Sequence, residues 1–223
     1  MAKETEDESE GMSVFRKDPK MQALLERKHY AVLKRIAHGA FGQVYKGAKT
    51  DGNGRVQEDQ LIAIKVIEMA RLQPIFREKY LPQELAALTH LHHKNIVRVH
   101  DIFRANERLY IAMEFAPNGD LSGWLKKNGP MKERLAAYWF AQVVAALSHV
   151  HSSLRMAHRD VKLDNVLLDA SHEAKLSDFG FAKECWDYKR HCVILSQTIC
   201  GTQPYFSPQL VDHVPYNAYM ADV

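Results

Sequence analysis

The hydrophobic pattern of the sequence changes near residue 116, and no other feature constrains the fold as strongly. Within 30–66, apolar and polar residues alternate in short segments separated by glycines and a polar loop, which predicts an antiparallel meander of β-strands. Two more strands are expected within 96–116, and the apolar spacing then becomes helical, as in 133–151. We therefore predict an α+β protein with a β-rich N-terminal lobe and a helical C-terminal lobe. A cleft between two such lobes is where a ligand is expected to bind.

Helices are expected in three segments. The first lies within 74–91, and its main part begins at Pro82, because proline is tolerated at the first position of a helix. Asp120 can cap a second helix, which should end at Gly129. In the third helix the apolar positions at i, i+3, i+4, i+7 and i+11 define one face, formed by Phe140, Val143, Val144, Leu147 and His151.

Composition and charge exclude several classes of protein. Lys and Arg together number 30 and Asp and Glu 27, so the net charge of +3 gives no reason to expect nucleic acid or a membrane surface as a partner. No apolar stretch is long enough to cross a bilayer and the N-terminus lacks the pattern of a secretory signal, so a cytoplasmic location is expected. The acidic start MAKETEDESE predicts a disordered tail over 1–27, followed by a folded domain over 28–223.

Residues of the β-rich half suggest that an anion binds there. Gly39 and Gly42 lie between two predicted strands, where backbone N–H groups could approach a phosphate, although such glycines commonly serve an ordinary hairpin. Lys65 lies inside the apolar segment LIAIKVI, so its charge must reach water, a carboxylate or a ligand anion. On an edge strand it would simply face water. Glu84 begins the following helix and could meet Lys65.

A charged segment, HRDVKLDN at 158–165, directly precedes the apolar run Val166–Leu168. Asp160 could accept the proton of an incoming hydroxyl group, and Asn165 offers a carbonyl oxygen to a hard divalent cation. Asp178, in the segment DFG, could supply a second metal ligand. Each of these residues taken alone is more typical of a turn. Their order along the chain argues against that interpretation.

The motifs occur in the order GAFGQV, AIK, the helix residue Glu84, HRDVKLDN and DFG, and in this order they resemble the motifs of eukaryotic protein kinases. The resemblance covers 30–223. Lys162, two residues after Asp160, resembles the serine/threonine branch, and Thr202 resembles the threonine that contacts both of these residues there. Segments such as KLSDFGFAK and VILSQTICGT are most similar to the testis-specific serine kinases, near the calcium/calmodulin-dependent group. That similarity would imply a role in spermatogenesis.

The resemblance assigns a role to each candidate residue, with ATP and Mg²⁺ as cofactors. Lys65, paired with Glu84, would hold the α- and β-phosphates of ATP. Asp160 would orient and deprotonate the substrate hydroxyl group, and Lys162 would meet the γ-phosphate. The two magnesium ligands would be Asn165 and Asp178. The nucleotide site would be formed by Ala37, Gly39, Gly42, Val44, Ala63, Lys65, Met113, Glu114, Ala116, Asp120 and Leu167.

The implied partners are protein substrates with Ser or Thr acceptors. Asp120 and Asp164 stand where basophilic kinases place acids, so a preference for Arg or Lys N-terminal to the acceptor is expected. The activation segment would span 178–209. An upstream kinase would phosphorylate Thr198, and the phosphate would pair with Arg159.

Departures from the family pattern leave an alternative open. Ala37 replaces the first glycine of the phosphate loop, and Gln209 replaces the glutamate that closes the activation segment. The kinase domain over 28–223 would have an N-lobe of about 28–114 and a C-lobe of about 117–223. The sequence stops at what resembles the start of the central C-lobe helix, so an incomplete C-lobe is expected. The alternative is a pseudokinase or a truncated, non-catalytic binding module.

Overall fold

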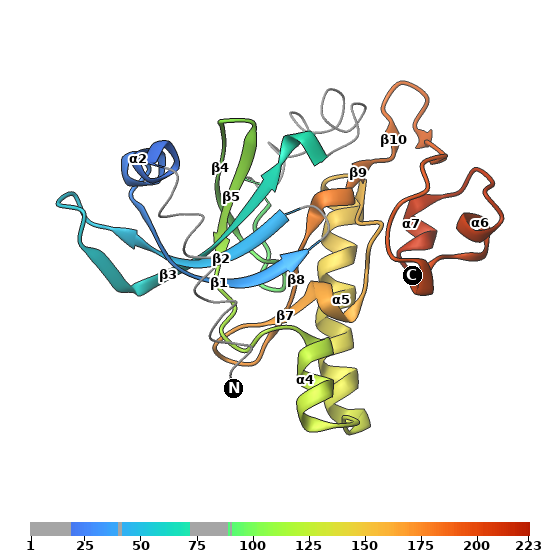
Figure 1. The fold of residues 1–223 in the computed structure, drawn as a ribbon. Coiled ribbons are helices and arrows are strands. Elements are labelled where there is room, and N and C mark those ends of the chain that lie inside the picture. The colour runs from blue at the N-terminus through green and yellow to red at the C-terminus, as the bar shows by residue number, and fades with distance from the viewer. Residues whose placement is uncertain (1–18, 40–41, 72–88, 90) are drawn as a thin grey trace. The chain divides into compact units, whose positions relative to one another are not determined.

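The computed structural model of the chain divides into two compact units (Figure 1). The first contains the described parts of 1–82 together with 98–115, and the second those of 83–97 together with 116–223. The first unit is built on a β-sheet and the second mainly on helices, which confirms the predicted α+β class. The structure describes residues 19–39, 42–71, 89 and 91–223.

The first unit is built on a five-stranded antiparallel sheet with the strand order β1-β2-β3-β5-β4. Its first three strands are neighbours both along the chain and in the sheet, so the predicted meander is confirmed. The strand expected from residue 96 begins instead at Val99. The bounds are β1 (Tyr30–Gly39), β2 (Gly42–Thr50), β3 (Val56–Glu68), β4 (Val99–Ala105) and β5 (Arg108–Glu114), with a 3₁₀ turn η1 (Met69–Arg71) after β3.

The segment that precedes the sheet corrects the predicted extent of the disordered tail. Residues 19–27 form helix α2 (Pro19–Arg27), whose Met21 and Leu25 are buried in the same apolar cluster as Phe103. Lys28, which follows the helix, forms an ion pair with Asp101 at 2.8 Å. Side chains at i and i+4 share one face of a helix, so this segment can bury two apolar groups against the sheet. The acidic stretch that motivated the prediction lies outside the described residues.

The second unit combines two longer helices with short strand pairs. The helices are α4 (Leu121–Asn128), α5 (Glu133–Ser153), α6 (Pro208–Val211) and α7 (Ala218–Ala221), and the 3₁₀ turns are η3 (Leu163–Asn165), η4 (Phe179–Phe181) and η5 (Gln203–Tyr205). The paired strands are β6 (Met156–Ala157) with β9 (Lys183–Glu184), β7 (Val166–Leu168) with β8 (Ala174–Leu176), and β10 (Trp186–Asp187) with β11 (Cys192–Val193). Within the part of the chain that the structure describes, no helix combines the length and hydrophobicity that a membrane span requires.

Both ends of α4 follow the prediction. The side chain of Asp120 accepts a hydrogen bond from the backbone N–H of Gly123 at 2.7 Å, which caps the helix. Gly129 ends it with φ 76°, a left-handed conformation that suits glycine, and its N–H donates to the Leu125 carbonyl. The helix expected within 74–91 falls almost entirely on residues outside the described part of the chain.

The buried face of α5 is not the face that the apolar spacing defines. The predicted side chains do lie on one face, where they line a single open pocket, but Phe140 is 70% exposed and Val144 is 46% exposed. The buried side chains are Trp139, Ala146, Leu147 and Val150. The helix therefore has two apolar stripes that meet at Leu147, and the periodicity alone does not tell which of them the unit covers.

Candidate active site

Lys65 lies on the central strand of the sheet, which removes the edge-strand interpretation. It pairs with Val44 of β2 on one side and with Ile111 of β5 on the other. Because β3 has a paired strand on each side, Lys65 does not lie on an edge strand. The sequence pattern places a positive charge in the middle of apolar strand residues, and such a charge requires a polar partner or a ligand.

Strand register brings five of the predicted nucleotide residues onto one face of this sheet. Residues directly opposite each other in an antiparallel pair share a face, as do residues i and i+2 of one strand. Ala37 pairs with Val44, Val44 with Lys65, and Ala63 with Met113. The opposite face carries the alternating residues of β3, which pack in the apolar cluster with α2. One face of the first unit thus presents apolar side chains around a lysine.

Gly42 has a structural reason to be glycine. A Cβ atom added there would lie 2.2 Å from the carbonyl oxygen of Val66 on β3, closer than any side chain can approach. Gly39 pairs directly with Gly42 at the end of the β1–β2 pair. The ordinary-hairpin interpretation therefore explains Gly42 by itself, and phosphate binding by this loop stays a prediction.

The remaining residues predicted for the nucleotide site lie at the end of β5 or later in the chain. Glu114 ends β5, and its N–H donates to the Arg98 carbonyl at 2.8 Å while its carboxylate accepts from the Arg98 N–H. In the second unit, the Ala116 carbonyl accepts from the Gly119 N–H. Leu167, in the middle of β7, forms a bridge with Asp120. Glu84 lies outside the described residues, so its pairing with Lys65 stays a prediction.

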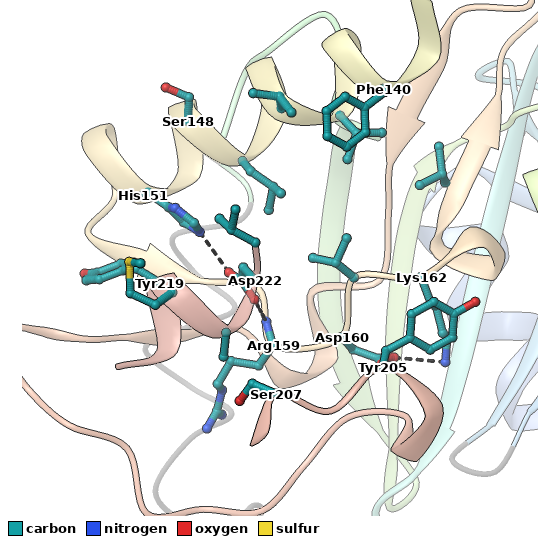
Figure 2. A pocket seen from close by; sticks show the side chains of 18 of the residues that line it. Phe140, Ser148, His151, Arg159, Asp160, Lys162, Tyr205, Ser207, Tyr219 and Asp222 are labelled. Carbon is teal, nitrogen blue, oxygen red and sulfur yellow. Dashed lines mark hydrogen bonds and ion pairs between the residues drawn. The ribbon is translucent and has the colours of Figure 1, made fainter. Parts of the chain in front are cut away.

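The second unit holds Asp160 in a set of polar contacts. Lys162 Nζ lies 3.0 Å from Asp160 Oδ2, as the dashed line in Figure 2 marks. The Thr202 hydroxyl donates to Asp160 Oδ1 at 2.7 Å and accepts from Lys162 Nζ at 2.7 Å. The predicted contacts of Thr202 with both residues are confirmed. A buried carboxylate whose two oxygens point in fixed directions is well placed to act as a general base.

The amide of Asn165 is oriented by Asp160. Its Nδ2 donates to the Asp160 backbone carbonyl at 2.8 Å and to Asp160 Oδ2 at 3.0 Å. Neither bond uses the amide oxygen of Asn165. Asp178 is exposed and left-handed, with φ 58° and ψ 70°, and its carboxylate accepts from the Gly180 N–H. An amide oxygen and a carboxylate are hard oxygen ligands, so this pair fits Mg²⁺ chemically.

Ring packing and hydrogen bonds fix His158. Its imidazole lies 4.9 Å from the Phe179 ring, centroid to centroid, and both side chains are buried. The Asp160 N–H donates to His158 Nδ1, so the ring hydrogen is on Nε2, which donates to the Ser177 carbonyl at 2.9 Å. His158 is therefore held by the Phe179 ring and by two hydrogen bonds.

Residues 30–223 match the family described as the protein kinase domain. The chain belongs to the protein kinase family. Testis-specific serine/threonine-protein kinase 4 of Homo sapiens is 31% identical over 217 residues, covering 90% of this chain and 62% of that protein. Testis-specific serine/threonine-protein kinase 1 of Mus musculus is 34% identical over 202 residues, covering 90% and 53%.

A relative from another group is NUAK family SNF1-like kinase 2 of Homo sapiens, 31% identical over 196 residues, covering 88% of this chain and 29% of that protein. The predicted resemblance to serine/threonine kinases, and to the testis-specific ones in particular, is confirmed. The kinase chain spans 53% to 62% of the length of the two testis-specific relatives.

Asp222, whose contacts the sequence interpretation did not predict, anchors the segment 158–165, which we call the catalytic loop after the family it resembles. Its carboxylate is fully buried and accepts from the backbone N–H groups of His158 at 2.7 Å and Arg159 at 2.6 Å. The same carboxylate lies 2.8 Å from His151 Nε2 on α5, and Figure 2 shows His151, Asp222 and Arg159 converging. These contacts could not be predicted locally, because the partners of Asp222 lie more than sixty residues away in the sequence.

The Arg159 side chain points to Ser196 rather than to the hydroxyl group of Thr198. Its Nε donates to the Phe181 carbonyl at 2.6 Å, and one terminal nitrogen lies 3.4 Å from Ser196 Oγ. Thr198 is held through its carbonyl, which accepts from the Tyr216 hydroxyl at 2.9 Å. Among the described residues, no carboxylate pairs with this buried guanidinium. A buried cation with only neutral acceptors favours an added anion.

The thiols near Arg159 are not activated. Burial raises the pKa of Cys185 and of Cys200, and the positive charge of Arg159 offsets only part of this effect. Both thiols therefore stay protonated at neutral pH and are poor nucleophiles. Burial also raises the pKa of Tyr219 to about 12, and its hydroxyl donates to the Arg155 carbonyl at 2.6 Å.

An open pocket of about 1600 Å³ adjoins the catalytic loop in the second unit (Figure 2). Its wall includes Phe140 and His151 of α5, Asp160 and Lys162 of the catalytic loop, and Tyr205 of η5. Most of the wall is apolar, and Asp160 and Lys162 are among its polar members, whereas Asp178 does not line it.

Proposed function

We propose that the protein transfers the γ-phosphoryl group of ATP to Ser or Thr residues of other proteins. The observation that carries the proposal is the arrangement around Asp160, whose carboxylate is held by Lys162, Thr202 and Asn165. The relatives that match are named as serine/threonine kinases, which supports the same reaction class.

Asp160 would act on the acceptor side of the reaction. The acceptor oxygen forms a bond to the γ-phosphorus, the bond from that phosphorus to ADP breaks, and the hydroxyl proton passes to Asp160. Lys162, 3.0 Å from Asp160 Oδ2, places a positive charge where the transferred group carries negative charge. Asn165 and Asp178 would hold magnesium, which supplies charge neutralisation of the phosphates when bound. Lys65 and the apolar face around it would receive the nucleotide.

Binding of Mg²⁺ and ATP tests the proposal on the chain as it exists. The unfolding temperature should rise with added MgATP, because a ligand at about 100 times its dissociation constant stabilises by about 2.7 kcal/mol. Lys65→Met should remove this rise, whereas Lys189→Met, at an exposed position, should keep it. An unchanged unfolding temperature in the wild-type chain would refute the proposal.

The substrate preference follows from two carboxylates. Asp164 is exposed, and Asp120 uses one carboxylate oxygen as the helix cap. We propose that both attract Arg or Lys N-terminal to the acceptor, because a guanidinium pairs well with carboxylates. In a phosphorylation assay with MgATP and Ser-containing peptides, basic peptides should be phosphorylated faster than acidic ones. MgATP binding without transfer to any peptide would instead favour the pseudokinase alternative, for which Ala37 and Gln209 argue.

Regulation would act through Arg159. We propose that an upstream kinase phosphorylates Thr198 and that the phosphate takes the guanidinium away from Ser196, because a dianion binds it more strongly than a hydroxyl group. Treatment with such a kinase should raise the activity of the wild-type chain and leave that of Thr198→Ala unchanged. A gain of equal size in the Thr198→Ala variant would contradict the assignment of this residue.

The names of the relatives also suggest a biological setting. A role in spermatogenesis is proposed on that ground alone, and transcripts spread evenly over tissues would contradict it. The cytoplasmic location expected from the sequence stays a prediction.

A further inference from the structure

Ser177 is a buried polar residue at the junction between β8 and Asp178. It is 7% exposed and follows Leu176, the last residue of the strand. Its backbone N–H donates to the Asn165 carbonyl at 2.8 Å. Its hydroxyl donates to the same carbonyl at 2.9 Å. Two donors of one residue therefore hold the backbone of a candidate magnesium ligand.

The carbonyl of Ser177 is also engaged. It accepts from His158 Nε2 at 2.9 Å, and His158 Nδ1 in turn accepts from the Asp160 N–H at 3.3 Å. The N–H, the hydroxyl and the carbonyl of Ser177 thus all have partners in the catalytic loop. Any buried residue needs partners for its backbone N–H and carbonyl, so the hydroxyl bond to Asn165 is the one that depends on serine at this position.

These bonds close a ring that contains the catalytic carboxylate. Asp160 donates to His158, His158 to Ser177, Ser177 to Asn165, and Asn165 back to Asp160. All four residues are buried. Hydrogen bonds in a ring of buried residues polarise and orient one another, so the loss of one bond changes the geometry and strength of the others. Ser177 is the member that is also bonded covalently to Asp178.

The geometry points to Ser177 as a positioning residue that couples the two magnesium ligands, Asn165 and Asp178, to the catalytic Asp160. Its hydroxyl holds the Asn165 backbone so that the Asn165 amide nitrogen faces Asp160 and the amide oxygen is left for the cation. Its peptide bond to Asp178 fixes the position of the Asp178 backbone, which has a left-handed conformation. This inference rests on the proposed function, because it assumes that Asn165 and Asp178 bind the cation.

The hydroxyl, rather than the backbone, is the part that can be tested. In Ser177→Ala the backbone bond to Asn165 and the bond from His158 remain possible, so the strand pairing should persist. Loss of one buried hydrogen bond should loosen the Asn165 carbonyl, and the cation affinity should fall about threefold to tenfold. Ser177→Thr keeps the hydroxyl and should restore the affinity, which a purely volume-dependent role would not predict.

The experiment measures Mn²⁺ binding to the full chain by electron paramagnetic resonance, with a non-hydrolysable ATP analogue present. Mn²⁺ stands in for Mg²⁺ because both prefer oxygen ligands. Ser177→Ala should bind Mn²⁺ more weakly, while Ser171→Ala, which removes an exposed hydroxyl, should match the wild type. Without metal and nucleotide, hydrogen exchange at 177–180 should be faster in Ser177→Ala alone. If Ser177→Ala does not fold, Ser177→Cys, with only a weak donor at similar volume, gives the same comparison.

The outcomes separate this inference from the proposed function. A wild-type chain that binds neither Mn²⁺ nor the nucleotide overturns the proposed function and this inference with it. A wild-type chain that binds both, with Ser177→Ala and Ser177→Cys equal to it, overturns this inference alone. Weaker Mn²⁺ binding that Ser177→Thr fails to restore also overturns it, since the hydroxyl would then not be the cause.

Discussion

Replacement of Asp160 by asparagine should lower the rate of phosphoryl transfer by a factor of about 10² to 10⁴ while leaving nucleotide binding intact. The substitution keeps the shape of the side chain but removes the base that takes the hydroxyl proton. It also replaces one carboxylate oxygen by an NH₂ group, which cannot accept a hydrogen bond. At the Oδ2 position this group would face Asn165 and Lys162, and at the Oδ1 position it would face Thr202. Initial rates with a basic Ser-containing peptide, together with the MgATP-dependent rise in unfolding temperature, measure the two effects separately.

Asp212→Asn is the matched control for this substitution. Asp212 is exposed and follows α6, and its side chain is not part of the ring around Asp160. Its variant should transfer phosphate at the wild-type rate. A rate for Asp160→Asn close to that of this control would show that Asp160 does not take the proton.

The change of hydrophobic pattern near residue 116 was sufficient to predict the fold class, and the family resemblance predicted the contacts of Thr202 with Asp160 and Lys162. Asp160, Lys162 and Asn165 are close in the sequence, so their meeting is largely a local matter. Thr202 joins them from forty residues further on, and only the resemblance to a family indicated that contact. Lys65 could be assigned to a strand from its apolar neighbours, but its position in the centre of the sheet required the strand order.

Long-range contacts of common residue types could not be predicted. Ser177 lies in the segment KLSDFGFAK and Asp222 near the end of the sequence, but neither segment indicates that the residue engages several groups of the catalytic loop. A serine or aspartate next to apolar residues has many possible partners, and the fold alone selects among them. The same limit applies to Ser196, which contacts Arg159 although the sequence pointed only to Thr198.

Composition gave one wrong boundary, and periodicity alone did not identify the buried face of α5. The acidic composition of the first ten residues was extended through residue 27, although Met21 and Leu25 supply an apolar pair at helical spacing. In α5 the face through Phe140 is as apolar as the face that is buried. Periodicity identifies a helix and its stripes, but burial depends on which neighbours pack against each stripe.

Replacement of Asp222 by alanine should lower the free energy of unfolding of the chain by about 3 to 5 kcal/mol. The buried N–H groups of His158 and Arg159 would lose their acceptor, and the imidazole of His151 would lose its partner. Arg159 is left-handed, with φ 67°, so its conformation depends on such bonds to persist. Urea unfolding followed by circular dichroism measures the change.

Two further variants decide how this loss arises. Asp222→Asn keeps one oxygen as an acceptor and should lose less than Asp222→Ala, because only one of the two backbone N–H groups is then left without a carbonyl or carboxylate oxygen. Asp212→Ala, at an exposed position, should change the free energy of unfolding by no more than about 0.5 kcal/mol. Equal losses in Asp222→Ala and Asp212→Ala would mean that the carboxylate does not support the catalytic loop. If instead Asp222→Ala loses most, Asp222→Asn loses less and Asp212→Ala loses almost nothing, the loop that carries Asp160 depends on the buried carboxylate of Asp222 for its conformation.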